Sequence, residues 1–166
     1  MDKYYYLISS LPLLKFTEKP FITSKDFIVE AEKWLSEEDF IILSKADVNN
    51  FLKDKKDTSL LKEWKQFEHS IREELVLFRR AKRKDVEYRI RRDLSSVIQE
   101  SSNPLEIERR LLFLRWDFLE EHELEHFFDL DFLIIYYLKL QILERLASFN
   151  KERGKERFES RSLVEI

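Results

Sequence analysis

Gly154 is the only glycine in this chain of 166 residues, and that scarcity limits the folds the chain can adopt. Tight β-hairpins, phosphate-binding loops and left-handed helix caps all depend on glycine. Proline is also rare, while the leucine, glutamate, lysine and arginine that favour long helices are abundant. We therefore predict an all-α protein, a single-domain bundle of about six to eight helices over residues 1–166, with one long helix or helical hairpin.

The composition favours a folded chain that needs neither a disulfide nor a metal. Hydrophobic residues make up 43% of the sequence, too many for intrinsic disorder. Cysteine is absent, which excludes thiolate nucleophiles and fits a reducing compartment, so we expect a cytoplasmic protein. The apolar stretch 4–11 is too short to span a bilayer and does not follow a clearly positive segment. We expect no signal peptide, no direct membrane insertion, no cofactor and no enzymatic activity.

Several residue pairs mark expected helix starts. The candidate N-caps are Thr23 with Asp26, Ser36 with Asp39, Thr58, and Asn103 before Pro104. Residues 4–11 have strand propensity, but their helical context leads us to expect a short buried helix. At the other end, Gly154 is a candidate left-handed cap for the last helix, followed by a polar tail at about 155–166.

Apolar residues recur every three or four positions between 60 and 78, which predicts an amphipathic helix over 59–84. The polar residues between them, Lys65 among them, are expected to face solvent. A second apolar stripe runs from Val86 to Val97. It lies either on the same helix, continuing through 85–100, or on a new helix after a break near Asp85.

Two later segments are apolar on more than one side. The helix expected after Asn103 carries Leu112 and Trp116 on one face and Leu111 and Leu114 on another. We therefore expect neighbours on both of its sides. The segment 132–149 is apolar nearly all round at its start, which predicts the central helix of the core.

A basic cluster occupies positions 79 to 92. Its members are Arg79, Arg80, Lys82, Arg83, Lys84, Arg89, Arg91 and Arg92. Together with two carboxylates, these eight cations give the segment a net charge of +6. The whole chain has a net charge of −3, so the remaining residues carry −9. On a helix, Asp85 would pair with Arg89, and Glu87 with Arg91, at i,i+4 spacing.

We interpret this basic cluster as a docking patch for an acidic protein partner, since charge complementarity steers association. The alternative is nucleic-acid binding with a steep salt dependence. Base stacking would need aromatic residues, and the segment offers only Tyr88.

The segment His122-Glu123-Leu124-Glu125-His126 matches the zinc-protease pattern, in which two histidines one helical turn apart bind zinc and the glutamate acts as general base. A third ligand would have to be His69 or a carboxylate such as Glu144. Asp129 and Phe132 stand where one protease class has a glycine and a third histidine. We favour a solvated acidic helix end and keep a zinc metallohydrolase as the weaker alternative.

Three segments resemble a bacterial family of uncharacterised proteins that are encoded among the subunits of V-type ATP synthases. They are Tyr4-Tyr5-Tyr6-Leu7-Ile8-Ser9-Ser10-Leu11-Pro12, Asn103-Pro104-Leu105-Glu106 leading to Arg115-Trp116-Asp117-Phe118-Leu119, and Phe128-Asp129-Leu130-Asp131 with Tyr137-Leu138-Lys139-Leu140-Gln141-Ile142-Leu143-Glu144-Arg145. More distantly, the first and last segments are similar to the central-stalk spacer of the V-type ATPase, the d subunit of eukaryotes. That spacer is an all-helical, funnel-shaped protein without enzymatic activity, between the central rotor stalk and the membrane ring.

The resemblance implies a non-catalytic accessory or central-stalk-type subunit of a V-type ATPase that acts by protein-protein binding in coupling or assembly. Its implied partners are rotor-stalk or membrane-ring subunits, which would hold the protein at the membrane periphery. This chain is much shorter than the spacer, which leaves open a homodimer as the equivalent of the longer protein.

Overall fold

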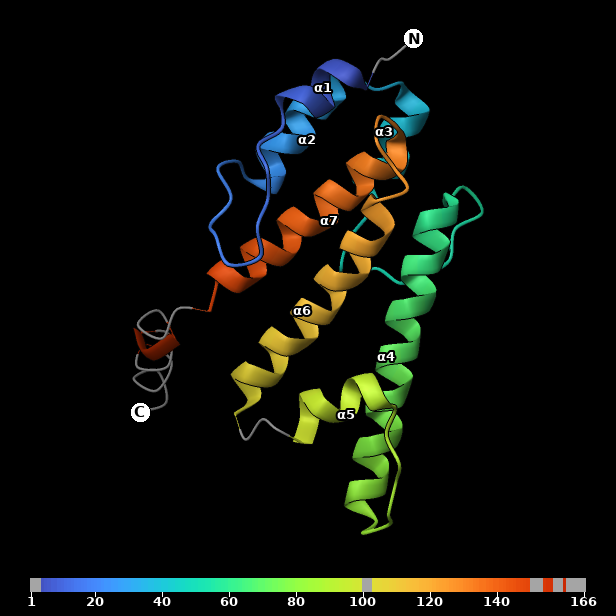
Figure 1. Ribbon diagram of the computed structural model, residues 1–166, viewed down its shortest axis with the longest axis vertical. Helices are drawn as coiled ribbons and strands as arrows, with labels where there is room; N and C mark the ends of the chain where they lie inside the picture. Colours follow the sequence, from blue (N-terminus) through green and yellow to red (C-terminus); the bar gives the residue numbers. More distant parts are fainter. Residues whose placement is uncertain (1–3, 100–102, 150–153, 157–159, 161–166) are drawn as a thin grey trace.

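The computed structural model describes residues 4–99, 103–149, 154–156 and 160. Every regular element among these residues is a helix, as predicted (Figure 1). The helices are α1 (Tyr5–Ser10), α2 (Ser24–Glu32), α3 (Glu37–Ser44), α4 (Ser59–Arg83), α5 (Arg92–Gln99), α6 (Pro104–Glu123) and α7 (Leu130–Ala147). The predicted segment 4–11 therefore contains a helix and not a strand, but its expected burial is wrong for Tyr5 and Tyr6, which are exposed, while Leu7 is buried. The predicted polar tail at 155–166 lies largely outside the described residues.

The helices begin where the N-cap residues predict. Thr23 and Asp26 form a reciprocal capping box: the Thr23 Oγ1 accepts from the Asp26 N–H at 3.1 Å, and the Asp26 carboxylate accepts from the Thr23 N–H at 3.2 Å. Hydrogen bonds from the Thr23 side chain and backbone lower the pKa of Asp26. The other predicted caps are confirmed at Ser36, Thr58 and Asn103. Asp129 also caps α7, accepting from the Phe132 N–H at 2.8 Å, which we did not predict.

Helix α7 is the central helix, as its apolar sequence predicts. It contacts α2, α3, α4 and α6, and forms an antiparallel hairpin with α6 (Figure 1). Its buried residues are Leu133, Ile134, Ile135, Tyr136, Leu138, Lys139, Leu140, Ile142 and Leu143. Apart from Lys139, these side chains form the centre of a main core to which α1, α2, α3 and the first half of α4 contribute.

Helix α6 lies between two hydrophobic clusters, which confirms the expectation of two buried faces. Leu112 and Trp116 belong to the main core. Leu111 packs instead in a second core with Ile71 of α4 and Leu94 of α5. The second core fixes α5 against the second half of α4 and the first half of α6.

The α4 helix stops at Arg83, so the two apolar stripes lie on separate helices. Asp85 adopts a φ of 52°, the left-handed conformation that ends a helix. The Val86 N–H donates to the Ala81 carbonyl at 3.0 Å, which closes a Schellman motif. Val86 is consequently 60% exposed, and the second stripe is buried only from Ile90 onward.

Gly154 does not cap the last helix, contrary to the sequence-based expectation. Helix α7 ends at Ala147, and its C-cap Ser148 keeps a right-handed conformation. The Ser148 N–H donates to the carbonyls of Glu144 and Arg145 at 3.0 and 3.1 Å. These bonds satisfy the last carbonyls without a left-handed residue.

Replacing Asp85 by glycine is expected to raise the free energy of unfolding by about 0.5 to 1 kcal/mol, because glycine adopts a positive φ without a Cβ clash. The matched variant Asp85→Ala removes the same charge but keeps the Cβ, so it should be less stable than wild type. Urea denaturation followed by circular dichroism measures both. Equal stability of the two variants would contradict the backbone explanation.

Candidate functional site

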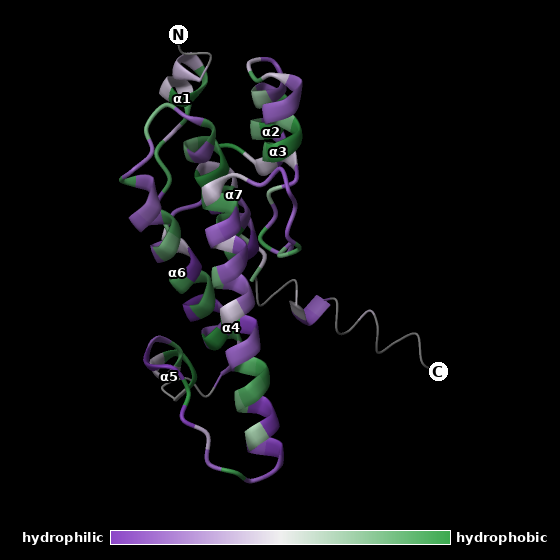
Figure 2. Cartoon of the chain, turned by 90° about the vertical axis from the view of Figure 1, so that its right-hand side faces the viewer, coloured by the Kyte–Doolittle hydropathy of each residue, from purple (hydrophilic) through white to green (hydrophobic). Residues whose placement is uncertain are grey.

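The eight predicted basic residues gather at one end of the molecule. They come from the last turns of α4, the segment that follows it, and the first residue of α5, and all eight are exposed. The end of α4 and the following loop project beyond the rest of the described chain (Figure 1, Figure 2). We call residues 79–92 the basic tip. None of the helices in the described part of the chain has the length and hydropathy to cross a bilayer.

Arg91 is the one member of the basic tip with an ion pair among the described residues. Its Nε and terminal nitrogen each lie 2.7 Å from a carboxylate oxygen of Asp93, and this hydrogen bonding raises the pKa of Arg91. Its backbone N–H also donates to Glu74 at 2.9 Å. The pairs predicted for Asp85 and Glu87 do not form, because residues 85–91 are not helical and the i,i+4 neighbours are not on one face.

The remaining seven cations have no ion-pair partner among the described residues. They are Arg79, Arg80, Lys82, Arg83, Lys84, Arg89 and Arg92. A cluster in which eight cations outnumber two carboxylates produces a local positive potential that attracts acidic partners and weakens as salt is added. The basic tip can therefore attract and orient an acidic surface.

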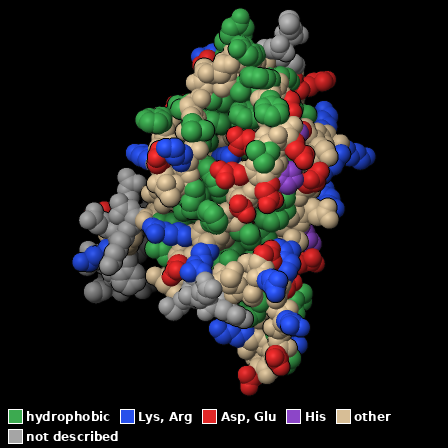
Figure 3. Space-filling model, in the orientation of Figure 1, with side chains coloured by type: hydrophobic (Ala, Val, Ile, Leu, Met, Phe, Trp, Pro, Cys, Tyr) green, Lys and Arg blue, Asp and Glu red, His purple; other side chains and the backbone are tan. Residues whose placement is uncertain are grey.

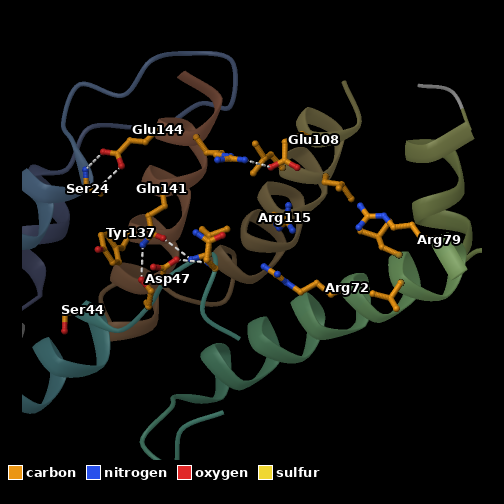
Figure 4. A pocket seen from close by; sticks show the side chains of 18 residues that line it. Ser24, Ser44, Asp47, Arg72, Arg79, Glu108, Arg115, Tyr137, Gln141 and Glu144 are labelled. Carbon is orange, nitrogen blue, oxygen red and sulfur yellow. Dashed lines mark hydrogen bonds and ion pairs between the residues drawn. The ribbon is translucent and has the colours of Figure 1, made fainter. Parts of the chain in front are cut away.

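A groove of about 810 Å³ lies between α4, α6 and α7 beside this tip (Figure 4). Its arginines are mostly held by the protein itself. The Arg72 Nε lies 3.5 Å from a carboxylate oxygen of Glu68, and the Arg145 Nη2 lies 3.5 Å from a carboxylate oxygen of Glu108. Arg79 reaches the rim of the groove and belongs to the basic tip. Only this arginine joins the two features.

The polar groups on the α7 side of the groove are also satisfied within the fold. Glu144 accepts from the N–H and the hydroxyl of Ser24, both at 2.7 Å. Gln141 accepts from the Val48 N–H at 2.9 Å. Burial, together with the charges of Asp47 and Glu144, raises the pKa of Tyr137 and keeps its phenol neutral. These contacts hold α2 and the loop after α3 against α7, so these polar groups have a structural role.

The zinc-protease pattern does not form its required geometry. Helix α6 ends at Glu123, so His122 lies in its last turn and His126 in the turn beyond it. The His122 Nε2 lies 3.2 Å from a Glu63 carboxylate oxygen, whereas the His126 Nδ1 lies 2.7 Å from Asp129. Glu123 pairs with Lys139 and is not free to act as a base.

The other proposed zinc ligands lie elsewhere. Glu144 is bound to Ser24, and the His69 Nδ1 lies 3.4 Å from Glu73 on α4. Within the described residues, no group of three or more histidines and carboxylates is placed to hold a metal ion. The segment His122–His126 therefore forms the end of α6 and the turn after it, and both of its histidines contact acidic side chains.

Sequence reasoning missed the buried charged residues. Lys65 was expected to face solvent, but it is buried and its Nζ lies 2.8 Å from both carboxylate oxygens of Asp57. The loop before α4 covers it, which no helical periodicity reveals. Glu68 is fully buried against Arg115. Its spacing from Trp64 and Ile71 places it within the apolar stripe, and that spacing was a usable signal.

A family model described as "Protein of unknown function (DUF2764)" matches residues 85–165. The matched part is slightly less than half of the chain and includes α5, α6, α7 and the end of the basic tip. The chain is similar to that family over these residues. None of the curated proteins and none of the solved structures compared with the chain matches it. Fold and candidate site thus define an all-helical protein with an exposed basic tip.

Proposed function

We propose that this protein is a non-catalytic helical subunit that binds an acidic protein surface through its basic tip, in the coupling or assembly of a V-type ATPase. The observation that carries the proposal is the set of seven exposed cations that lack ion-pair partners among the described residues. Like charges gathered in this way repel one another, and the positive potential that they create attracts an acidic partner.

The geometry of the tip suits a docking contact. Its side chains are already exposed, and complementary carboxylates on a partner would accelerate encounter and fix orientation. The second core anchors the base of the tip through Ile90 and Leu94. The tip is therefore held by packed helices and is available to a partner at the same time.

The sequence resemblance to proteins encoded with V-type ATP synthase subunits supports the choice of partner complex. The all-helical fold of this chain is of the same class as that of the central-stalk spacer of the V-type ATPase, which is also all-helical. Rotor-stalk or membrane-ring subunits are the proposed binding partners, which would keep the protein at the cytoplasmic side of the membrane without inserting into it.

Charge reversal at the basic tip tests the proposal. The triple variant Arg80→Glu, Lys82→Glu and Arg83→Glu is expected to lower recovery of ATPase subunits with the tagged full chain by on the order of tenfold. The matched control Lys53→Glu, Lys55→Glu and Lys56→Glu makes the same charge change on exposed residues elsewhere and should retain the complex. Quantitative mass spectrometry of the purified complexes measures the difference.

Two outcomes would contradict the proposal. Recovery of no ATPase subunit with the wild-type chain would contradict the proposed partner complex. Equal recovery of ATPase subunits with both triple variants would show that the basic tip is not the contact.

Nucleic-acid binding is the alternative that the same charges allow. Tyr88 is half-buried, so the described residues of the tip offer no fully exposed ring for base stacking. Fluorescence anisotropy with a labelled DNA duplex and a labelled single strand measures this alternative. We expect weak binding that vanishes at physiological salt, whereas tight binding that the tip variant abolishes would favour the nucleic-acid function.

A further inference from the structure

A second exposed surface lies at the turn between α6 and α7, toward the end of the molecule opposite to the basic tip (Figure 1). Leu124 is 77% exposed and Phe127 is 68% exposed. With the half-buried Phe132 they line a groove of about 560 Å³. Large apolar side chains that stay together in water are typical of a binding surface. We call this feature the turn groove.

Carboxylates surround the apolar floor of the turn groove. Its acidic lining residues are Asp117, Glu120, Glu121 and Glu123. Lys139 offsets part of this charge, since it pairs with Glu123 and its Nζ lies 3.8 Å from a Glu120 oxygen. Asp117 and Glu121 have no ion pair among the described residues. Figure 3 shows acidic side chains around hydrophobic ones on the upper half of this face.

A row of aromatic rings extends the apolar surface from the same turn. The ring centroids of Phe128 and Tyr5 are 5.1 Å apart, those of Tyr5 and Tyr6 5.9 Å, and those of Tyr6 and Trp34 5.9 Å. All four rings are exposed on their outer sides. Rigid aromatic side chains are enriched in protein interfaces. The turn groove and this row together provide apolar anchors next to uncompensated negative charge.

We propose that the turn groove binds an amphipathic helix of a partner protein, with leucine-like side chains on the apolar floor and flanking lysines or arginines facing the carboxylates. Charge complementarity selects this occupant, because an acidic helix would meet repulsion from Asp117 and Glu121. This partner has the opposite charge to the partner of the basic tip. The protein thereby acts as a bridge that holds an acidic surface at one end and a basic helix at the other.

Binding of two designed peptides to the full chain tests the proposal. The probe is a fluorescein-labelled helical peptide of about 18 residues made of leucine and lysine, and its counterpart replaces lysine with glutamate. Fluorescence anisotropy should show saturable binding of the leucine–lysine peptide and none of the leucine–glutamate peptide. The double variant Leu124→Ser and Phe127→Ser should weaken the binding at least about tenfold.

Matched variants separate a specific site from general attraction of a cationic peptide. The control Leu13→Ser and Leu52→Ser removes side chains that are 78% and 74% exposed elsewhere and should leave the affinity unchanged. Glu121→Lys should weaken binding and flatten its salt dependence. The charge-reversed tip variant should bind the peptide as wild type does, so failure of the tip proposal would not affect this result.

Three results would overturn the inference. The leucine–glutamate peptide could bind equally well, or the Leu13 and Leu52 control could lose as much affinity as the groove variant. In the third, sedimentation would show that the wild-type chain dimerises and that the Leu124 and Phe127 variant is monomeric. That result would make a second copy of the chain the occupant of the turn groove. The basic tip of that copy would offer both positive charge and an exposed apolar side chain, Val86.

Discussion

Replacing Arg115 by methionine is expected to lower the free energy of unfolding by about 3 kcal/mol, measured by urea denaturation. The side chain of Glu68 is 1% exposed, and that of Arg115 is 10% exposed. The Arg115 Nε donates to one carboxylate oxygen of Glu68, and the Arg115 Nη2 donates to the other at 3.2 Å. Removing the arginine leaves a buried carboxylate without its main partner, a larger cost than losing both charges.

Two variants make this expectation specific. The double replacement Glu68→Leu with Arg115→Met removes the whole pair, so most of the lost stability should return. Arg109→Met on the exposed face of the same helix should change the stability by less than about 0.5 kcal/mol. A double variant as unstable as Arg115→Met alone would show that packing, and not an unpaired charge, causes the loss.

Replacing Trp116 by alanine is expected to cost about 3 to 5 kcal/mol, because it leaves a large cavity between α6 and α7. The side chain is 2% exposed. Its ring lies 5.6 Å from that of Phe16, and the Lys139 ammonium lies 4.8 Å from its centroid. The same ring therefore joins the segment before α2 to the central hairpin. Thermal and urea denaturation of the full chain measure the effect.

Trp34 provides the matched control. It is 42% exposed in the turn that follows α2, so Trp34→Ala should cost less than about 1.5 kcal/mol. Similar losses for the two tryptophan variants would contradict the assignment of Trp116 to the main core. Trp34→Ala also shortens the aromatic row beside the turn groove without changing the core.

The two proposed binding surfaces differ in how they arise from the chain. The basic tip is contiguous in sequence, so its charge could be predicted by counting residues from 79 to 92. The turn groove combines the end of α6, the turn and the start of α7, and the aromatic row beside it adds α1 and Trp34 from the turn after α2. Charge of opposite sign at the two ends makes simultaneous contact with two different partners electrostatically compatible.

The sequence by itself determined the helical class and most helix starts. Scarce glycine, apolar residues at helical spacing, and caps such as Thr23, Thr58 and Asn103 act through contacts within a few residues. A pattern of this kind needs no knowledge of distant neighbours. The same local logic left open whether the helix breaks near Asp85, and it assigned a left-handed cap to Gly154, whereas the left-handed conformation is found at Asp85.

Tertiary structure alone decided which charges are buried and which apolar residues stay exposed. Glu68 and Arg115 are 47 positions apart in sequence and meet only because α4 and α6 pack together. Leu124 and Phe127 are hydrophobic, yet α6 ends at Glu123 and turns them outward. Burial depends on which elements become neighbours, and that is set by long-range packing of the whole chain, which helical periodicity does not contain.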